Sequence, residues 1–273
     1  MKAFLAAVLI SAATLPAAEP VDVLIIAPHP DDEVIGCTGV ILQALEQKKK
    51  VAVVVMTNGD GFPKGTAAIT GKPRAELKPE DFFKLARLRQ KQSYEGIRLV
   101  GLKKRDVAFL SYPDGGLAAI YHSDSGVTYR NKHTGKAETY GLIGQDYHSA
   151  RHGKPASYTK ASILGDLAEI IRERSPSEIY VTHELDQHSD HRAAMWFVRD
   201  AAGQVGFRGQ LFTFIVHGKK LPEGSVRRVQ LSPNQLAVKK AAIGVHKIPK
   251  VHDHLVDTHA KEAELFWPIK VLP

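Results

Sequence analysis

Continuous apolar runs alternate along the chain with segments that carry polar residues at intervals. Buried strands are typical of such β-branched runs, and five are expected, over residues 21–27, 50–57, 107–110, 179–182 and 211–216. The segments between them are helix candidates, over 40–47, 81–100, 162–174 and 191–202, with the clearest helical period over 81–100. Strands that alternate with helices form βαβ units. The pattern therefore predicts an α/β protein with a mostly parallel sheet.

Polar clusters follow four of the expected strands at their carboxyl ends, over residues 29–33, 58–61, 113–116 and 183–191. In open parallel sheets, ligands bind outside this edge. The four clusters are therefore expected to form one composite site.

The first cluster is His29-Pro30-Asp31-Asp32-Glu33. Adjacent carboxylates repel each other, so a bound cation or different roles for Asp31 and Asp32 would explain the pair. The alternative is an acidic turn that caps the following helix.

The second cluster contains His188 and His191, three residues apart, with Asp190 between them. Two histidines and a carboxylate are a common ligand set for zinc or ferrous iron, although a solvated polar loop has the same composition. The sequence has no glycine-rich phosphate loop, dinucleotide fingerprint or nucleophile elbow, so water activated by a metal is the simplest chemistry that remains.

The N-terminus has the layout of a secretory signal peptide. Lys2 is followed by an apolar run and then by small residues up to Ala18, and the run is too short to span a bilayer comfortably. We expect a signal peptide over 1–18, one domain over 19–273, a secreted or periplasmic protein, and no membrane span after cleavage. An uncleaved anchor is the alternative. The single cysteine, Cys37, excludes an intramolecular disulfide.

The formal net charge is +8, from 37 basic and 29 acidic residues. The basic residues are scattered and lack aromatic partners for base stacking, which argues against nucleic-acid binding. An acidic polysaccharide surface remains compatible with this charge.

Four ordered motifs resemble the PIG-L/LmbE-like family of deacetylases. They are Pro28-His29-Pro30-Asp31-Asp32-Glu33, Thr57-Asn58-Gly59-Asp60-Gly61, Tyr112-Pro113-Asp114-Gly115-Gly116-Leu117 and His188-Ser189-Asp190-His191-Arg192-Ala193-Ala194, and the similarity continues into Lys239 to Lys247. The resemblance implies a three-layer sandwich around a Rossmann-like sheet, and a zinc-dependent enzyme in which Fe²⁺ could replace Zn²⁺. The implied reaction removes the acetyl group from an N-acetylated amino sugar.

The resemblance also implies roles for single residues. His29, Asp32 and His191 would bind the metal, and Asp31 would act as the general base. His188, as an imidazolium, would stabilise the tetrahedral oxyanion, with Asp190 orienting it. Asp114 is similar to the family residue that binds sugar hydroxyls.

Arg89 falls on the apolar stripe of the helix expected over 81–100, where an unpaired charge is costly. A structural salt bridge and substrate binding are equally compatible with that position. Its spacing matches the family's Arg-x-x-Glu, but Gln92 stands at the acidic position, and Ile248-Pro249 replaces the family's Ser-Gln after His246-Lys247. Both departures concern the substrate rather than the metal.

The expected function is hydrolysis of the N-acetyl group of an N-acetylglucosamine-type sugar or glycan. The alternatives are an amidase for another amide, such as a thiol conjugate or antibiotic, and an inactive carbohydrate-binding protein. Residues 117–158 interrupt the alternation of strands and helices, which is typical of a functional loop or of a disordered segment. Its tyrosines could stack on sugar rings or pack within the loop; they are Tyr121, Tyr129, Tyr140 and Tyr147.

Overall fold

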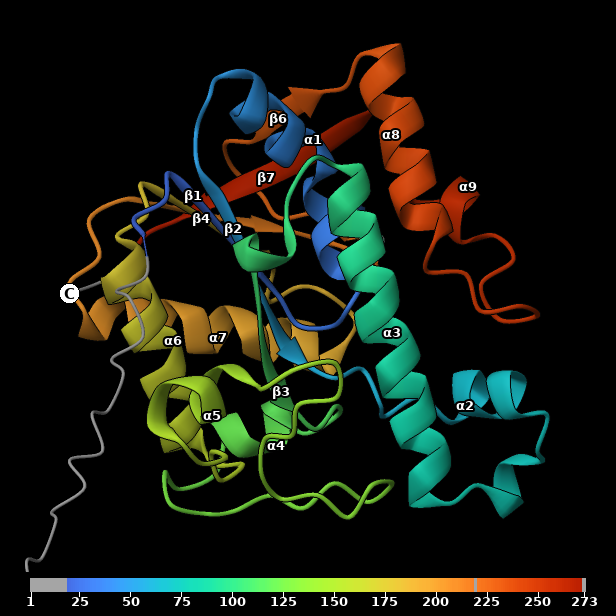
Figure 1. Cartoon of the computed structure of the whole chain (residues 1–273). Helices are drawn as coiled ribbons and strands as arrows, with labels where there is room; N and C mark the ends of the chain where they lie inside the picture. The colour runs from blue at the N-terminus through green and yellow to red at the C-terminus, as the bar shows by residue number, and fades with distance from the viewer. Residues whose placement is uncertain (1–18, 219, 272–273) are drawn as a thin grey trace, which may run out of the picture.

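The computed structural model describes residues 19–218 and 220–271, which form a seven-stranded sheet with helices on both faces (Figure 1). The strand order is β3-β2-β1-β4-β5-β7-β6. The five strands from β3 to β5 are parallel, and β7 and β6 extend that edge as antiparallel strands. The bounds are β1 Val23–Ala27, β2 Val51–Thr57, β3 Val107–Tyr112, β4 Glu178–Thr182, β5 Gln210–Phe214, β6 Arg227–Gln230 and β7 Ala263–Ile269.

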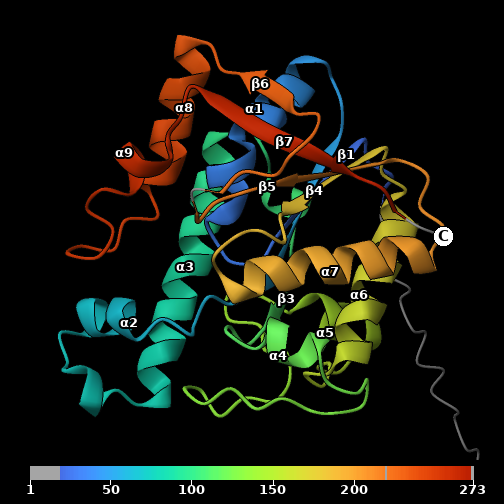
Figure 2. The same ribbon diagram turned by 180° about the vertical axis from the view of Figure 1, so that it is seen from behind.

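Two hydrophobic clusters, one on each face, make the molecule a three-layer sandwich. Alternate residues of β1 point to opposite faces, so Leu24 and Ile26 join one cluster while Val23 and Ile25 join the other. Figures 1 and 2 show α1, α3 and α8 on one side of the sheet and α4, α6 and α7 on the other. The helix bounds are α1 Asp32–Glu46, α2 Pro63–Thr70, α3 Pro79–Leu99, α4 Leu117–Tyr121, α5 Tyr147–His152, α6 Lys160–Arg174, α7 Ser189–Gln204, α8 Pro233–Gly244 and α9 Leu255–His259.

The expected fold class is confirmed, and β1 to β5 lie within two residues of their predicted bounds. The predicted start of the first helix is wrong, because α1 begins at Asp32 rather than at residue 40. Gly36 and Gly39 lower the helical propensity of residues 32–39, the part of α1 that the sequence pattern did not predict. Both are required by packing: a Cβ on Gly36 would lie 2.1 Å from the Phe214 ring, and one on Gly39 would lie 2.9 Å from the Glu264 carboxylate.

A buried ion pair ties the antiparallel edge to the helical layer above it. Lys239 of α8 donates from Nζ to the carboxylate of Glu264 in β7 at 2.6 Å. That carboxylate also accepts hydrogen bonds from the backbone N–H groups of Gly39 and Val40 in α1. Both charges are thus partnered, as buried charges must be.

Within the described residues, none of the helices has both the length and the apolar character that crossing a membrane requires. The predicted signal peptide falls on residues 1–18, outside the part of the chain that the structure describes.

Candidate metal centre

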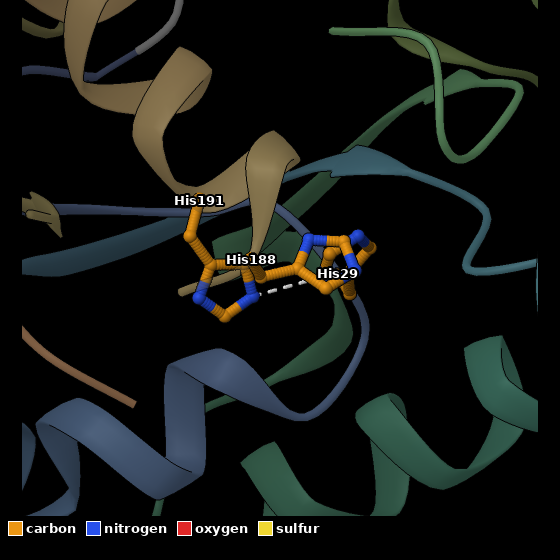
Figure 3. Close-up of side chains that lie close together, drawn as sticks. All are labelled: His29, His188 and His191. Carbon is orange, nitrogen blue, oxygen red and sulfur yellow. Dashed lines mark hydrogen bonds between the residues drawn. The ribbon is translucent and has the colours of Figure 1, made fainter. Parts of the chain in front are cut away.

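The carboxyl ends of neighbouring strands bring the sequence motifs together. β1 pairs with β4, so the His29–Asp32 turn after β1 lies beside the loop that leads from β4 to α7. His188 caps the N-terminus of α7 and His191 lies in its first turn. Figure 3 shows the imidazoles of His29, His188 and His191 close together, with a dashed line between His29 and His191.

Three donor atoms form a nearly equilateral triangle. His29 Nδ1 lies 3.1 Å from His191 Nε2, and each of these nitrogens lies 3.2 Å from Asp32 Oδ2. Donor atoms around a tetrahedral zinc ion, at metal distances of about 2.0–2.2 Å, are separated by about 3.4 Å. The triad of His29, Asp32 and His191 therefore fits a single zinc ion with little movement.

Other residues of the cluster also offer donor atoms close to the triad. His188 can join His29 and His191, and His217 can join Asp32 and His191, with donor atoms within 4.8 Å of one another. These wider groupings share members with the triad, whose three donor atoms lie 3.1–3.2 Å from one another. The ligand set of His29, Asp32 and His191 stays a prediction, and the triad's geometry fits it.

Carboxylates behind the two imidazoles orient them. Asp114 Oδ1 lies 2.9 Å from His29 Nε2, and Asp186 Oδ2 lies 3.2 Å from His191 Nδ1. Burial alone would lower the pKa of His191, but Asp32 and Asp186 raise it to about 9. A pocket that stabilises positive charge on buried imidazoles is electrostatically suited to a cation.

Asp31 is set apart from the triad by its backbone. Its φ of 143° lies in a region that non-glycine residues rarely adopt, although aspartate and asparagine tolerate positive φ better than most. The side chain accepts from Arg89 Nη2 at 3.0 Å, so Asp31 and Asp32 point to different partners. Strain of this kind is typical of functional turns.

Arg89 is buried, with an exposed fraction of 8%. Besides Asp31, it donates to the carbonyl oxygens of Gly59 and Pro30, both at 3.1 Å. The structure therefore places the guanidinium in an internal salt bridge, which holds the turn that carries Asp31. The predicted substrate-binding role of Arg89 stays a prediction.

The Asp190 carboxylate, which was expected to orient His188, has other partners in the structure. Asp190 Oδ2 accepts from Gly115 N at 2.8 Å and lies 3.8 Å from His29 Nε2. It is the backbone N–H of Asp190 that donates to His188 Nδ1, at 3.2 Å. An acceptor Nδ1 leaves the proton on Nε2, which makes His188 a neutral imidazole in this structure; its role as an imidazolium at the oxyanion stays a prediction. Burial, followed by the charges of His29 and His191, lowers the pKa of His188 to about 4.

Asp114 was expected to face sugar hydroxyls, yet both of its carboxylate oxygens have protein neighbours. Oδ1 lies against His29, and Oδ2 accepts from Gly61 N at 3.0 Å. The arrangement is that of a carboxylate which orients a metal-binding histidine. Its role toward substrate stays a prediction.

Asp114→Asn should weaken zinc binding by about 10–100-fold, because an amide cannot supply the negative charge that holds the His29 ring. Competition with a chromophoric chelator would measure this affinity. Glu95→Gln, on the exposed face of α3, is the matched control and should leave zinc affinity unchanged. Unchanged affinity in Asp114→Asn as well would contradict the assignment.

Sequence reasoning missed His217, which follows β5. Its ring centroid lies 5.0 Å from that of His191, and its backbone N–H donates to Asp186 Oδ2. The signal was available, because His217 lies near the carboxyl end of a predicted strand. It also lines a cavity of about 810 Å³, together with Gln187, Phe214 and Trp267.

The tyrosines of residues 117–158 pack against the protein. Tyr121 donates to Asp200 and lies against Phe197, and Tyr140 donates to the buried Asp60. Tyr129 and Tyr147 pack against the hydrophobic cluster of the α6–α7 face. Of the two interpretations of these tyrosines, loop packing is therefore the one that the structure favours. The segment still borders the site, because Asn131 donates to the Asp114 carbonyl at 2.6 Å.

A histidine–carboxylate centre at the carboxyl edge of a parallel sheet defines the chain as a candidate metal-dependent α/β hydrolase. The family model described as PIG-L: GlcNAc-PI de-N-acetylase matches residues 24–202, more than half of the chain. The chain belongs to the PIG-L family of metal-dependent deacetylases. Comparison of the sequence with curated proteins finds no match.

Solved structures with this fold carry different activities. N,N'-diacetylchitobiose deacetylase from Pyrococcus horikoshii is 20% identical, with 91% of this chain and 83% of that chain covered and a TM-score of 0.54. The zinc-inhibited form of teicoplanin deacetylase Orf2 is 16% identical, with coverage of 90% and 97% and a TM-score of 0.59. The 4-carboxy-2-hydroxymuconate hydratase of Pseudomonas putida KT2440 is also 16% identical, with coverage of 93% and 97% and a TM-score of 0.57. These likenesses show the fold alone.

Proposed function

We propose that the protein is a zinc-dependent hydrolase that removes the N-acetyl group from an N-acetylglucosamine-type sugar or glycan. The observation that carries this proposal is the triad of His29, Asp32 and His191 beside a separately held Asp31 carboxylate. Family membership supplies the deacetylase chemistry. The amino-sugar specificity rests on the family description and on the chitobiose deacetylase among the structural neighbours.

Each site residue has a task in this reaction. When bound, zinc supplies a Lewis acid and lowers the pKa of a coordinated water to about 7. Asp31 accepts a proton from the attacking water, and its salt bridge to Arg89 fixes the direction of its carboxylate. His188 Nε2–H donates a hydrogen bond to the carbonyl oxygen as negative charge develops there, an effect typically worth about 3 kcal/mol. Asp31 then returns the proton to the departing amine, which yields acetate and a free amino sugar.

A panel of N-acetylated compounds tests the substrate class. We expect acetate release from N-acetylglucosamine or its short β-linked oligomers, with one free amine formed per acetate. N-acetylated amino acids and thiol conjugates serve as non-sugar amides. Turnover confined to these would replace the amino-sugar proposal with the amidase alternative, and turnover of none would favour the carbohydrate-binding protein.

We also propose that the protein acts outside the cytoplasm, because Lys2 and the following apolar and small residues have the layout of a signal peptide. Mass spectrometry of the protein from an exported fraction should give a mature start close to Glu19. An intact Met1 start in a membrane fraction would favour the uncleaved anchor instead.

A further inference from the structure

A second group of histidines and carboxylates lies on the opposite helical layer from α1 and α3. His148 and His152 are one helical turn apart on α5, and Asp166 and Glu169 face them from α6. His148 Nδ1 lies 2.7 Å from Asp166 Oδ1, and His152 Nε2 lies 3.0 Å from Glu169 Oε2. None of these four residues belongs to the candidate metal centre.

The geometry of the group fits a metal ion. Donor atoms of His148, His152 and Asp166 lie within 4.8 Å of one another, and the two imidazole centroids are 4.4 Å apart. Glu169 offers a fourth donor from the next turn of α6. Bringing these donors to the separation of about 3.4 Å around tetrahedral zinc requires side-chain rotations, for which His152, with 41% of its side chain exposed, has room.

The exposed fractions of Asp166, His148 and His152 suit a structural ion that enters from solvent. The Asp166 side chain is 2% exposed, and its Oδ2 accepts from Tyr112 OH at 2.7 Å, which turns Oδ1 toward His148. The His148 side chain is 21% exposed and that of His152 is 41% exposed. One ligand is therefore fixed in the core, while another can move to close the site.

The donor types select the class of metal. Two imidazoles favour zinc or a neighbouring transition metal, whereas calcium and magnesium prefer sites built from oxygen donors alone. Without a metal, the same groups form two hydrogen-bonded histidine–carboxylate pairs between the helices, and Arg151 adds a contact to Glu169 at 3.3 Å. A bound ion would replace the pairing protons and link all four side chains through one centre.

We propose that His148, His152, Asp166 and Glu169 form a second divalent metal site, occupied by zinc, which fastens α5 to α6. The site is structural. It anchors the segment over residues 117–158, which has few long helices or strands of its own, to the α6–α7 layer. Metal bound there adds stability to the folded state by mass action.

Zinc stoichiometry in variants of the whole chain tests this site. The protein would be stripped with a chelator, reloaded with zinc alone and passed through gel filtration before elemental analysis. We expect two zinc ions per wild-type chain and one in the His148→Gln/His152→Gln double variant. Asp166 is left intact because its bond to Tyr112 also supports the core. The matched control is His254→Gln, because the His254 side chain is 88% exposed. This variant should retain both ions.

His29→Ala separates this inference from the proposed function. The variant lacks a ligand of the candidate metal centre and should retain one ion, on α5 and α6. Its cobalt form should show the visible absorption of a tetrahedral site, and the double variant combined with His29→Ala should lose it. A His29→Ala protein that retains no metal, or a double variant that retains as much zinc as the wild type, would overturn the second site.

Thermal unfolding gives an independent measurement. Zinc at 100 times its dissociation constant stabilises a single site by about 2.7 kcal/mol, so zinc should raise the Tm of His29→Ala. The rise should vanish when His148 and His152 are also replaced. Turnover in the His148→Gln/His152→Gln variant should stay near the wild-type value, because these residues lie outside the candidate centre. An equal rise in Tm with and without the two histidines would contradict the proposal.

Discussion

Asp31→Asn should retain zinc and lose turnover by roughly two to four orders of magnitude. The carboxylate is the only group that the mechanism assigns to proton transfer from water, and an amide cannot accept that proton. Asparagine is the right replacement, because it has the size and shape of aspartate and removes only the charge. Elemental analysis would measure the metal, and acetate release would measure turnover.

The control for Asp31→Asn is a carboxylate-to-amide change at an exposed position outside the site. Glu95→Gln removes an exposed carboxylate that pairs with Arg98, away from the site, and should leave kcat within twofold of the wild type. If Asp31→Asn keeps near-normal activity while its zinc content is unchanged, Asp31 is not the general base. If it loses zinc as well, the residue belongs among the ligands.

His29→Ala should release zinc from the candidate centre and lower turnover by about a thousandfold or more. The imidazole is one corner of the triad, and its Nε2 is the group that Asp114 holds. Metal ions stabilise charge in the transition state by several kcal/mol, and about 4 kcal/mol corresponds to a thousandfold in rate. Zinc affinity and kcat/KM would be measured on the same sample.

His188→Gln provides a contrast with His29→Ala. Glutamine retains an N–H donor, and His188 is assigned to the carbonyl oxygen rather than to the metal, so zinc affinity should stay close to that of the wild type. If His29→Ala keeps its full zinc affinity while His188→Gln loses zinc, then His188 is a metal ligand and His29 is not.

The sequence predicted the fold where local patterns are strong. β1 and β2 are continuous apolar runs, and their bounds were found to within two residues. The antiparallel strands β6 and β7 were missed, because β6 is short and polar at three of its four positions and β7 contains Pro268. The predicted start of α1 is too late because Gly36 and Gly39 are required for packing against Phe214 and Glu264, which lie 178 and 225 positions further along the chain.

The same distinction between local and long-range information applies to the site. The rule that ligands bind outside the carboxyl ends of parallel strands predicts from the sequence that the motifs of His29 and His191 lie together. It could not give the partners of each carboxylate, because Asp190 meets Gly115 across 75 positions in sequence and Asp114 turns to a histidine 85 positions earlier. The direction of a side chain depends on those distant contacts. His217 was overlooked because it belongs to no recognised motif.

Zinc-dependent acetate release from metal-stripped protein tests the central claim most directly. The His148→Gln/His152→Gln variant would be used, so that the triad of His29, Asp32 and His191 is the proposed site of loading, with the most active N-acetylated sugar of the panel as substrate. We predict that acetate and free amine appear together, rise in proportion to added zinc and saturate at one ion per chain. Acetate release that proceeds equally well without metal, or a fully loaded triad that releases no acetate from any substrate, would contradict the account.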